Sequence, residues 1–291
     1  MTTAQATRST VPGALVTTAW AREHLHDPTV RFLEVDVDTD SYDTGHLPGA
    51  TGVNWKSQLT DAVRRDLVSR DDLELLLRAA GVDDDTTIVL YGDNNNWFAA
   101  WAYWQLRYQG LDNVRLLDGG RVKVEAEGLP LTTDVPEHTP GTITLPHETL
   151  EELRAYRQQV IDGIGRKIRS LVDVRSPEEF RGELAAPAHL PQEAAQRRGH
   201  IPGAVNVPWS QAVASDGTFK PIDDLRSLYG GEGVDGSGEI IAYCRIGERS
   251  SHTWFVLHEL LGYQDVRNYD GSWTEYGSLV GVPIETGESA S

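Results

Sequence analysis

One cysteine, Cys244, is the only thiol among 291 residues, and it stands in the run Tyr-Cys-Arg-Ile-Gly-Glu-Arg-Ser at 243–250. An apolar run precedes it and a helical pattern follows. A thiol at such a junction faces backbone N–H groups and the positive end of the helix dipole, and Arg245 and Arg249 add positive charge. We therefore expect the pKa of Cys244 to fall. A buried, inert cysteine is the competing interpretation, but unpaired buried charge beside it would be costly. The pattern predicts a nucleophile.

The elements that must position this thiol are a strand over 239–243 and a helix over 253–261, which Gly262 ends. Upstream, 170–174 has the composition of a strand. The sequence Ser-Pro-Glu-Glu at 176–179 then opens a helix with a capping box and a proline at its first position. Both halves of the chain alternate short apolar runs with helical patterns, which is typical of βα units around a parallel sheet. The predicted fold class is α/β.

The chain repeats itself once. Gly-His-Leu-Pro-Gly-Ala at 45–50 recurs as Gly-His-Ile-Pro-Gly-Ala at 199–204, and Ile-Val-Leu-Tyr at 88–91 is answered by Ile-Ile-Ala-Tyr at 240–243. One copy in each half favours a duplicated domain over a solenoid, which needs more and shorter units. We expect an N-terminal domain over 1–131, a linker rich in Thr and Pro over 132–146, and a C-terminal catalytic domain over 147–291.

The two copies differ where chemistry is expected. In the alignment of the repeats Cys244 corresponds to Gly92, and Arg245 corresponds to Asp93. The N-terminal copy keeps the scaffold but has neither the thiol nor the positive charge. It is therefore expected to be catalytically inactive.

Composition limits the partners. The formal charge of −18 argues against nucleic acid and against an anionic membrane, and no apolar run is long enough to span a bilayer. A lone cysteine excludes a disulfide within the chain and favours a reducing compartment. Together with the lack of a secretion signal, this predicts a cytoplasmic protein. The histidines show no zinc-binding spacing, so we expect neither a metal nor another cofactor.

Over essentially its whole length the sequence resembles the two-domain rhodaneses, which are thiosulfate sulfurtransferases. The likeness rests on four motifs taken together: the doubled Gly-His-Leu/Ile-Pro-Gly-Ala, Asp-Val-Arg at 173–175, the loop at 244–249, and Asp-Gly-Ser-Trp at 270–273. The resemblance implies two tandem rhodanese-like domains, each a parallel sheet flanked by helices.

The resemblance also implies a mechanism. Cys244 would open a six-residue loop that surrounds its sulfur with backbone N–H groups, a nest that suits a thiolate or a persulfide anion. The thiolate would take sulfur from thiosulfate and pass it to cyanide or a thiol acceptor, with ping-pong kinetics. The remaining site residues are the donor-binding arginines and the members of the loop: Arg249, Arg245, Arg175, Ile246, Gly247 and Glu248.

Departures from the family pattern bear on the substrate. Glu179 stands where the animal thiosulfate enzymes have a second donor-binding arginine, and Ile246 stands where they have a lysine. Relatives that use 3-mercaptopyruvate have a hydroxyl at the position of Ile246, which works with a histidine. Without that hydroxyl, thiosulfate is the favoured donor and 3-mercaptopyruvate is the alternative. His46 and His200 are then expected to be structural.

Two further alternatives stay open. Phosphatases and arsenate reductases on this scaffold use Cys-x5-Arg, but here the sixth residue after the cysteine is Ser250 and the arginine comes one place early. The shorter loop should fit a sulfur atom better than a phosphoryl group. A sulfur carrier or binding module would hold a persulfide without rapid turnover. The polar insertion at 182–198 is expected to be a lid or a loop.

Overall fold

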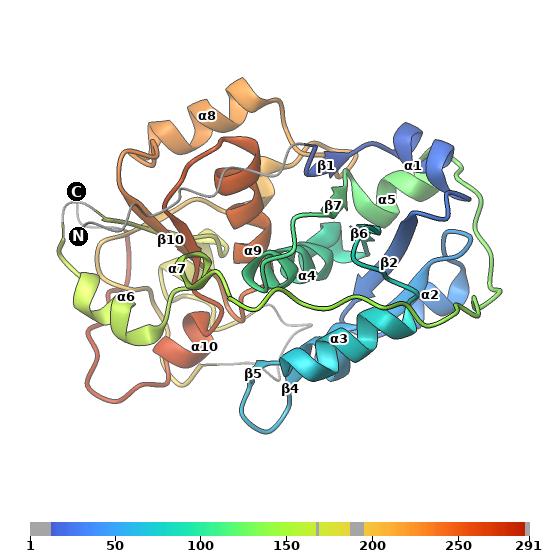
Figure 1. Cartoon of the computed structure of the whole chain (residues 1–291). Helices are drawn as coiled ribbons and strands as arrows, with labels where there is room; N and C mark the ends of the chain where they lie inside the picture. The colour runs from blue at the N-terminus through green and yellow to red at the C-terminus, as the bar shows by residue number, and fades with distance from the viewer. Residues whose placement is uncertain (1–12, 167–168, 187–194, 289–291) are drawn as a thin grey trace, which may run out of the picture. The chain divides into compact units, whose positions relative to one another are not determined.

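The computed structural model describes residues 13–166, 169–186 and 195–288, which form two compact units (Figure 1). The N-terminal unit comprises Gly13–Leu150 and the short segment Val213–Phe219. The C-terminal unit comprises the described parts of Glu151–Ala212 and Lys220–Ser291. Part of the insertion at 182–198 lies outside the described residues.

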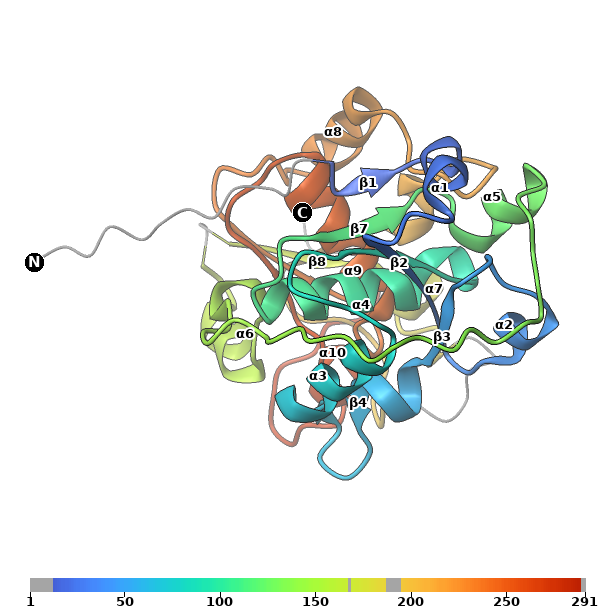
Figure 2. The same ribbon diagram turned by 45° about the vertical axis from the view of Figure 1, so that its right-hand side comes forward.

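The N-terminal unit is built on a five-stranded parallel sheet in the order β1-β7-β6-β2-β3. Figure 2 shows β1 beside β7 at one edge of this sheet. The strands are β1 (Leu15–Val16), β2 (Val30–Asp36), β3 (Thr51–Asn54), β6 (Thr87–Tyr91) and β7 (Val114–Leu117). The helices are α1 (Thr18–His24), α2 (Asp40–Thr44), α3 (Arg70–Ala79), α4 (Trp97–Tyr108) and α5 (Gly120–Ala126), with a hairpin of β4 (Thr60–Asp61) and β5 (Asp66–Leu67).

The C-terminal unit has a four-stranded parallel sheet in the order β11-β10-β8-β9. Its strands are β8 (Arg169–Asp173), β9 (Ala204–Asn206), β10 (Glu239–Tyr243) and β11 (Val266–Asn268). Its helices are α6 (Arg157–Gly163), α7 (Pro177–Phe180), α8 (Ile222–Gly231), α9 (Glu248–Phe255), which continues as a π-helical turn over Val256–Leu260, and α10 (Ser272–Tyr276). Ser176 caps α7 through the predicted capping box.

The predicted duplication is confirmed by the strand order. Strands β7, β6, β2 and β3 lie in the same sequence across one sheet as β11, β10, β8 and β9 across the other. The register agrees too, because Tyr91 pairs with Glu34 and Tyr243 pairs with Asp173. The two sheets are therefore copies of one α/β arrangement, and β10 is the inner strand from which the cysteine loop leaves.

Helices cover both faces of each sheet because successive strand residues point to opposite sides. In the N-terminal unit Phe32 and Val89 pack in a core with residues of α1 and α5, whereas Leu33 and Leu90 face leucines of α3 and α4. In the C-terminal unit Ile241 and Tyr243 pack against residues of α6, α7 and α10, and α9 packs against β10 and β11. Strands buried on both faces form a rigid platform for the loops at their carboxyl ends.

The segment 132–146, expected to be a linker, is hydrogen-bonded along the N-terminal unit. Gly141 N–H donates to the carbonyl of Arg78 at 2.8 Å, and Ile143 N–H donates to that of Val82 at 3.1 Å. A Cβ atom at Gly141 would lie 2.0 Å from Val82 O, so only glycine allows this close approach. The division into domains and linker at these boundaries stays a prediction.

Candidate active site

Cys244 lies at the carboxyl end of β10, and a short loop leads from it to Gly247, the residue before α9. Gly247 has a φ of +103°, which favours glycine and turns the chain sharply back over the thiol. Its backbone N–H donates to Cys244 Sγ at 3.1 Å. The Cys244 N–H in turn donates to Ser272 Oγ at 3.1 Å, which fixes the start of the loop.

A polar network that the sequence did not reveal holds Gly247 in place. Ser250 Oγ lies 3.7 Å from the sulfur and donates to Asn268 Oδ1 at 2.6 Å. Asn268 Nδ2 donates to Ser251 Oγ, which donates to the Gly247 carbonyl, both at 2.8 Å. The amide that faces the sulfur is thus oriented before any substrate arrives. The adjacent serines were visible in the sequence, but their partner on β11 was not.

The expected fall in the pKa of Cys244 is wrong. The thiol is fully buried, and burial raises its pKa; the Glu248 carboxylate raises it further, while the Arg249 guanidinium and a backbone hydrogen bond from Ser250 only partly oppose this. The side chains around the thiol are polar, unlike those around a cysteine in an apolar core, and its role as the nucleophile stays a prediction. The prediction failed because the sequence shows the nearby cations but neither the burial nor the approach of an acid.

That acid is Glu248, expected only as a member of the loop. It is 1% exposed, and its Oε2 accepts a hydrogen bond from Cys244 Sγ at 3.2 Å. Glu248 is the first residue of α9, so its position depends on where the helix begins. The sequence alone does not locate the start of α9, because no side chain caps this helix at Gly247.

Arg249, predicted to bind the donor, is 3% exposed and held between two carboxylates. Its Nη1 and Nη2 donate to the two oxygens of Glu179 at 2.8 and 3.2 Å, and its Nε lies 3.5 Å from Glu248 Oε1. Burial raises the pKa of Glu179, but the guanidinium outweighs it and holds that pKa below its usual range. Glu179 therefore completes the capping box and also neutralises Arg249.

Arg175 makes contacts that stabilise the fold of the C-terminal unit. Its guanidinium donates to both oxygens of Asp173, and Nη2 also donates to the Gly199 carbonyl at 2.7 Å. The Cζ atom lies 4.6 Å from the centre of the Trp273 ring. These contacts connect three of the sequence motifs: Asp-Val-Arg, the second Gly-His-Ile-Pro-Gly-Ala and Asp-Gly-Ser-Trp. A role for Arg175 in binding the donor stays a prediction.

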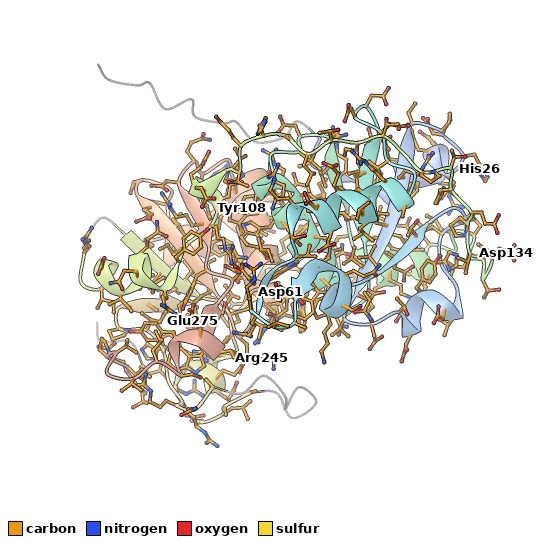
Figure 3. All side chains as sticks on the ribbon, turned by 60° about the horizontal axis from the view of Figure 1, so that its bottom comes forward. His26, Asp61, Tyr108, Asp134, Arg245 and Glu275 are labelled. Atoms are coloured by element: carbon orange, nitrogen blue, oxygen red, sulfur yellow. The ribbon has the colours of Figure 1, made fainter. Side chains whose placement is uncertain are left out.

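Arg245 and Ile246 complete the loop and are 3% and 6% exposed. The Arg245 carbonyl accepts a hydrogen bond from Thr274 N at 3.0 Å, and Figure 3 places Arg245 close to α10, the helix that carries Glu275. The role predicted for Arg245 in donor binding is not tested by these contacts.

Comparison with known proteins now identifies the family. The family described as Rhodanese-like domain matches residues 17–127 and 156–279, one match in each half of the chain. The chain belongs to the rhodanese family. This rhodanese is 58% identical over 271 residues, 93% of its own length and 95% of the relative's, to a protein of Saccharopolyspora erythraea that carries the provisional name thiosulfate sulfurtransferase.

Two other relatives widen the comparison. The Thermus thermophilus protein named sulfur carrier protein TtuD is 53% identical over 281 residues, 95% of this chain and 98% of that protein. The crystal structure of SseA from Escherichia coli, described as a 3-mercaptopyruvate sulfotransferase, aligns with a TM-score of 0.77 at 26% identity and covers 90% of this chain and 99% of SseA.

The repeated histidines of this rhodanese serve the fold, as expected. His46 stacks on Tyr42 with ring centres 3.7 Å apart and bonds its carbonyl through Nδ1 at 3.0 Å. His200 stacks on Phe180 at 3.6 Å and bonds its carbonyl in the same way at 2.8 Å. Each ring thereby ties its Gly-His turn to the short helix before it.

Proposed function

We propose that this rhodanese is a sulfurtransferase that carries sulfane sulfur on Cys244, taking it from thiosulfate and passing it to cyanide or a thiol. The observation that supports this most directly is the loop that aims the Gly247 N–H at the sulfur from 3.1 Å. This N–H and the backbone hydrogen bond from Ser250 both suit a sulfur anion. The names of the relatives from S. erythraea and T. thermophilus agree with sulfur chemistry.

The reaction has two steps. Cys244 Sγ attacks the outer sulfur of thiosulfate; the new Sγ–S bond forms as the S–S bond of thiosulfate breaks and sulfite leaves with the bonding electrons. The acceptor then attacks the outer sulfur of the persulfide and regenerates Cys244. Covalent catalysis of this kind predicts ping-pong kinetics.

The choice of thiosulfate rests on the loop. Ile246 offers no hydroxyl to a 3-mercaptopyruvate carbonyl, and the histidine of each repeat is engaged in its own turn. The similarity to SseA keeps 3-mercaptopyruvate as the second candidate donor. The similarity to TtuD keeps a carrier role open, in which a protein thiol takes the sulfur and turnover with cyanide is slow.

We also propose that the N-terminal domain is inactive because its equivalent loop is filled. A Cβ atom on Gly92 would lie 2.3 Å from Val35 O, so the position that corresponds to the cysteine has no room for a side chain. The Gly92 N–H donates to Asn96 Oδ1 at 2.9 Å, much as the Cys244 N–H donates to Ser272 Oγ. Asn96 Nδ2 is bound to the Leu117 carbonyl at 2.7 Å. Asp93, in place of Arg245, would repel an anionic donor.

The partners proposed are small: an anionic sulfur donor and a thiol or cyanide. No helix in the described part of the chain has the length and hydropathy to cross a bilayer. Across residues 13–166, 169–186 and 195–288, no three His, Cys, Asp or Glu side chains are grouped to hold a metal ion. A cytoplasmic location remains a proposal from the lone cysteine.

The decisive experiment measures sulfur transfer to cyanide from thiosulfate and from 3-mercaptopyruvate, with an aryl phosphate as a third substrate. We expect thiosulfate to be preferred, Cys244→Ala to be inactive, and the wild-type protein to gain the mass of one sulfur atom that cyanide removes. Phosphatase activity, or transfer that persists in Cys244→Ala, would contradict the proposal. Sulfur loading without turnover would favour the carrier role.

A further inference from the structure

Glu248 touches the nucleophile and has no part in the reaction as described so far. Its Oε2 accepts the thiol hydrogen bond at 3.2 Å, its Oε1 lies 3.5 Å from Arg249 Nε, and 99% of the residue is buried. A carboxylate is rarely buried unless it is paired or used. Here it lies beside the one atom that must lose a proton.

The site has an electrostatic difficulty that Glu248 can resolve. If the thiol were simply ionised, two negative charges would lie 3.2 Å apart without water to screen them. Burial and this neighbour both raise the pKa of the thiol, which disfavours the thiolate. A nucleophile in this setting needs an acceptor for its proton at the moment of attack.

We propose that Glu248 takes the proton from Cys244 as the sulfur attacks the donor and returns it when Sγ leaves the persulfide. This inference rests on the proposed sulfurtransferase function and assigns a general base and general acid to it. The distance from Oε2 to Sγ already allows direct proton transfer in the resting protein.

The charges balance in both steps. First, thiol, carboxylate and thiosulfate become persulfide anion, carboxylic acid and sulfite: the Sγ–S bond forms, the thiosulfate S–S bond breaks, and the proton moves to Oε2. Second, a thiolate acceptor takes the outer sulfur, the Sγ–S bond breaks with its electrons left on Sγ, and the proton returns from Oε2. The buried pair keeps one negative charge throughout, so a second charge is never introduced into it.

Arg249 and Glu179 act as positioning residues in this scheme. Arg249 lies within ion-pair distance of both carboxylates, which keeps Glu248 beside the sulfur. From α9, Glu248 and Arg249 act directly on the titration of Cys244. From α7, Glu179 acts through Arg249, whereas Ser272 and Asn268, on α10 and β11, are uncharged.

The test compares Glu248→Gln and Glu248→Asp with wild type and with Glu232→Gln, an exposed control at the end of α8. Persulfide formation is followed in single turnovers by mass spectrometry across pH, and thiolate is followed by its ultraviolet absorbance. Because Cys244 is the only cysteine, both signals report on one sulfur. Rates in heavy water show whether a proton moves during the attack.

We expect Glu248→Gln to lower the pKa of the thiol and yet to slow sulfur uptake about 10²-fold near neutral pH. Its rate should follow the thiolate fraction as pH rises, and the solvent isotope effect of the wild type should disappear. Glu248→Asp, which keeps a carboxylate, should recover part of the rate. If the glutamine variant does not fold, the pH profile and solvent isotope effect of Glu248→Asp test the proposal instead. Glu232→Gln should match wild type.

The two proposals fail in different ways. If Glu248→Gln takes up sulfur as fast as wild type, or faster in proportion to its thiolate, Glu248 only tunes the thiol and the inference is wrong. If wild-type protein takes up no sulfur from thiosulfate or 3-mercaptopyruvate, the proposed function is wrong and the role of Glu248 falls with it.

Discussion

Arg249 shows at the scale of one residue how closely stability and chemistry are joined. Replacing it in Arg249→Met leaves Glu179 and Glu248 buried without their cation. We expect a loss of about 3 to 5 kcal/mol in the free energy of unfolding, as is usual when one partner of a buried pair is removed. Urea unfolding measures this, with Arg226→Met, whose ion pair with Asp223 is exposed, as a control that should be nearly silent. A similar small effect for both variants would show that the buried cluster contributes little.

The pH dependence of Cys244 is a second prediction for a single residue. Burial, and then Glu248, raise the pKa of this thiol, so its ultraviolet titration should have a midpoint above the usual range for cysteine. Because the folded protein holds the proton more tightly than the unfolded chain, this group stabilises the fold below the pKa of an unfolded cysteine. That stability is lost as pH rises through the raised pKa. A midpoint below the usual range would restore our first expectation.

Much of the site could be predicted from residues alone, but not its charge balance. Motif and spacing group the thiol with its loop and Arg249, and the structure brings these residues together, while their catalytic and donor-binding roles stay predictions. The partners of Arg249 were not predicted: Glu179 is distant in sequence and was explained by its capping box, and Glu248 had no assigned role. A pairing between residues far apart in sequence, such as Arg249 with Glu179, arises only when strands and helices are packed, so it leaves no local pattern. Glu248 is close to Cys244 in sequence, but its approach to the sulfur depends on where α9 begins.

At the scale of elements, the junction of strand and helix differs between the repeats in a way that can be tested. A Cβ atom on Gly92 would lie 2.3 Å from Val35 O and 2.7 Å from Asp36 Oδ1. Adding a thiol there, in Gly92→Cys on a Cys244→Ala background, should destabilise the protein and should not create a sulfur carrier. Mass spectrometry after thiosulfate treatment and urea unfolding measure the two effects.

The matched control for this prediction is Gly230→Cys, because a Cβ atom at Gly230 meets open space. Its stability should stay close to that of the Cys244→Ala background. Sulfur retained on a thiol introduced at Gly92 would contradict the proposal that the N-terminal loop is closed.

The elements themselves were predicted unevenly. The strand at 239–243 and the capped start of α7 were correct, since local composition and the Ser-Pro-Glu-Glu signal determine both. The helix after the cysteine begins at Glu248, five residues before the expected start at 253, because its first turn is polar and lacks the apolar spacing that marks helices. Its polar first turn is the part that serves the site.

At the scale of the whole molecule, the repeat revealed the fold but not how the chain is shared between its units. Val213–Phe219 follows the second Gly-His motif, yet it belongs to the N-terminal unit. Lys123 Nζ pairs with Asp216 at 2.6 Å, and Phe219 N–H donates to Asp118 Oδ1 at 2.9 Å. Aligning the two repeats cannot show that Val213–Phe219 belongs to the other unit, because only one of the two repeats contributes such a segment.

The net charge of −18 yields a prediction for the approach of the donor. Thiosulfate is a dianion, and the positive charge of Arg249 is already shared with Glu179 and Glu248. Long-range repulsion should then dominate encounter, and screening by salt should relieve it. We expect kcat/KM for thiosulfate to rise several-fold between low and physiological ionic strength.

Alkylation of Cys244 by neutral iodoacetamide is the control, and its rate should change little with ionic strength. A fall in kcat/KM with salt would show instead that cations near the loop, with Arg245 the first to test, govern the capture of the donor despite the acidic surface.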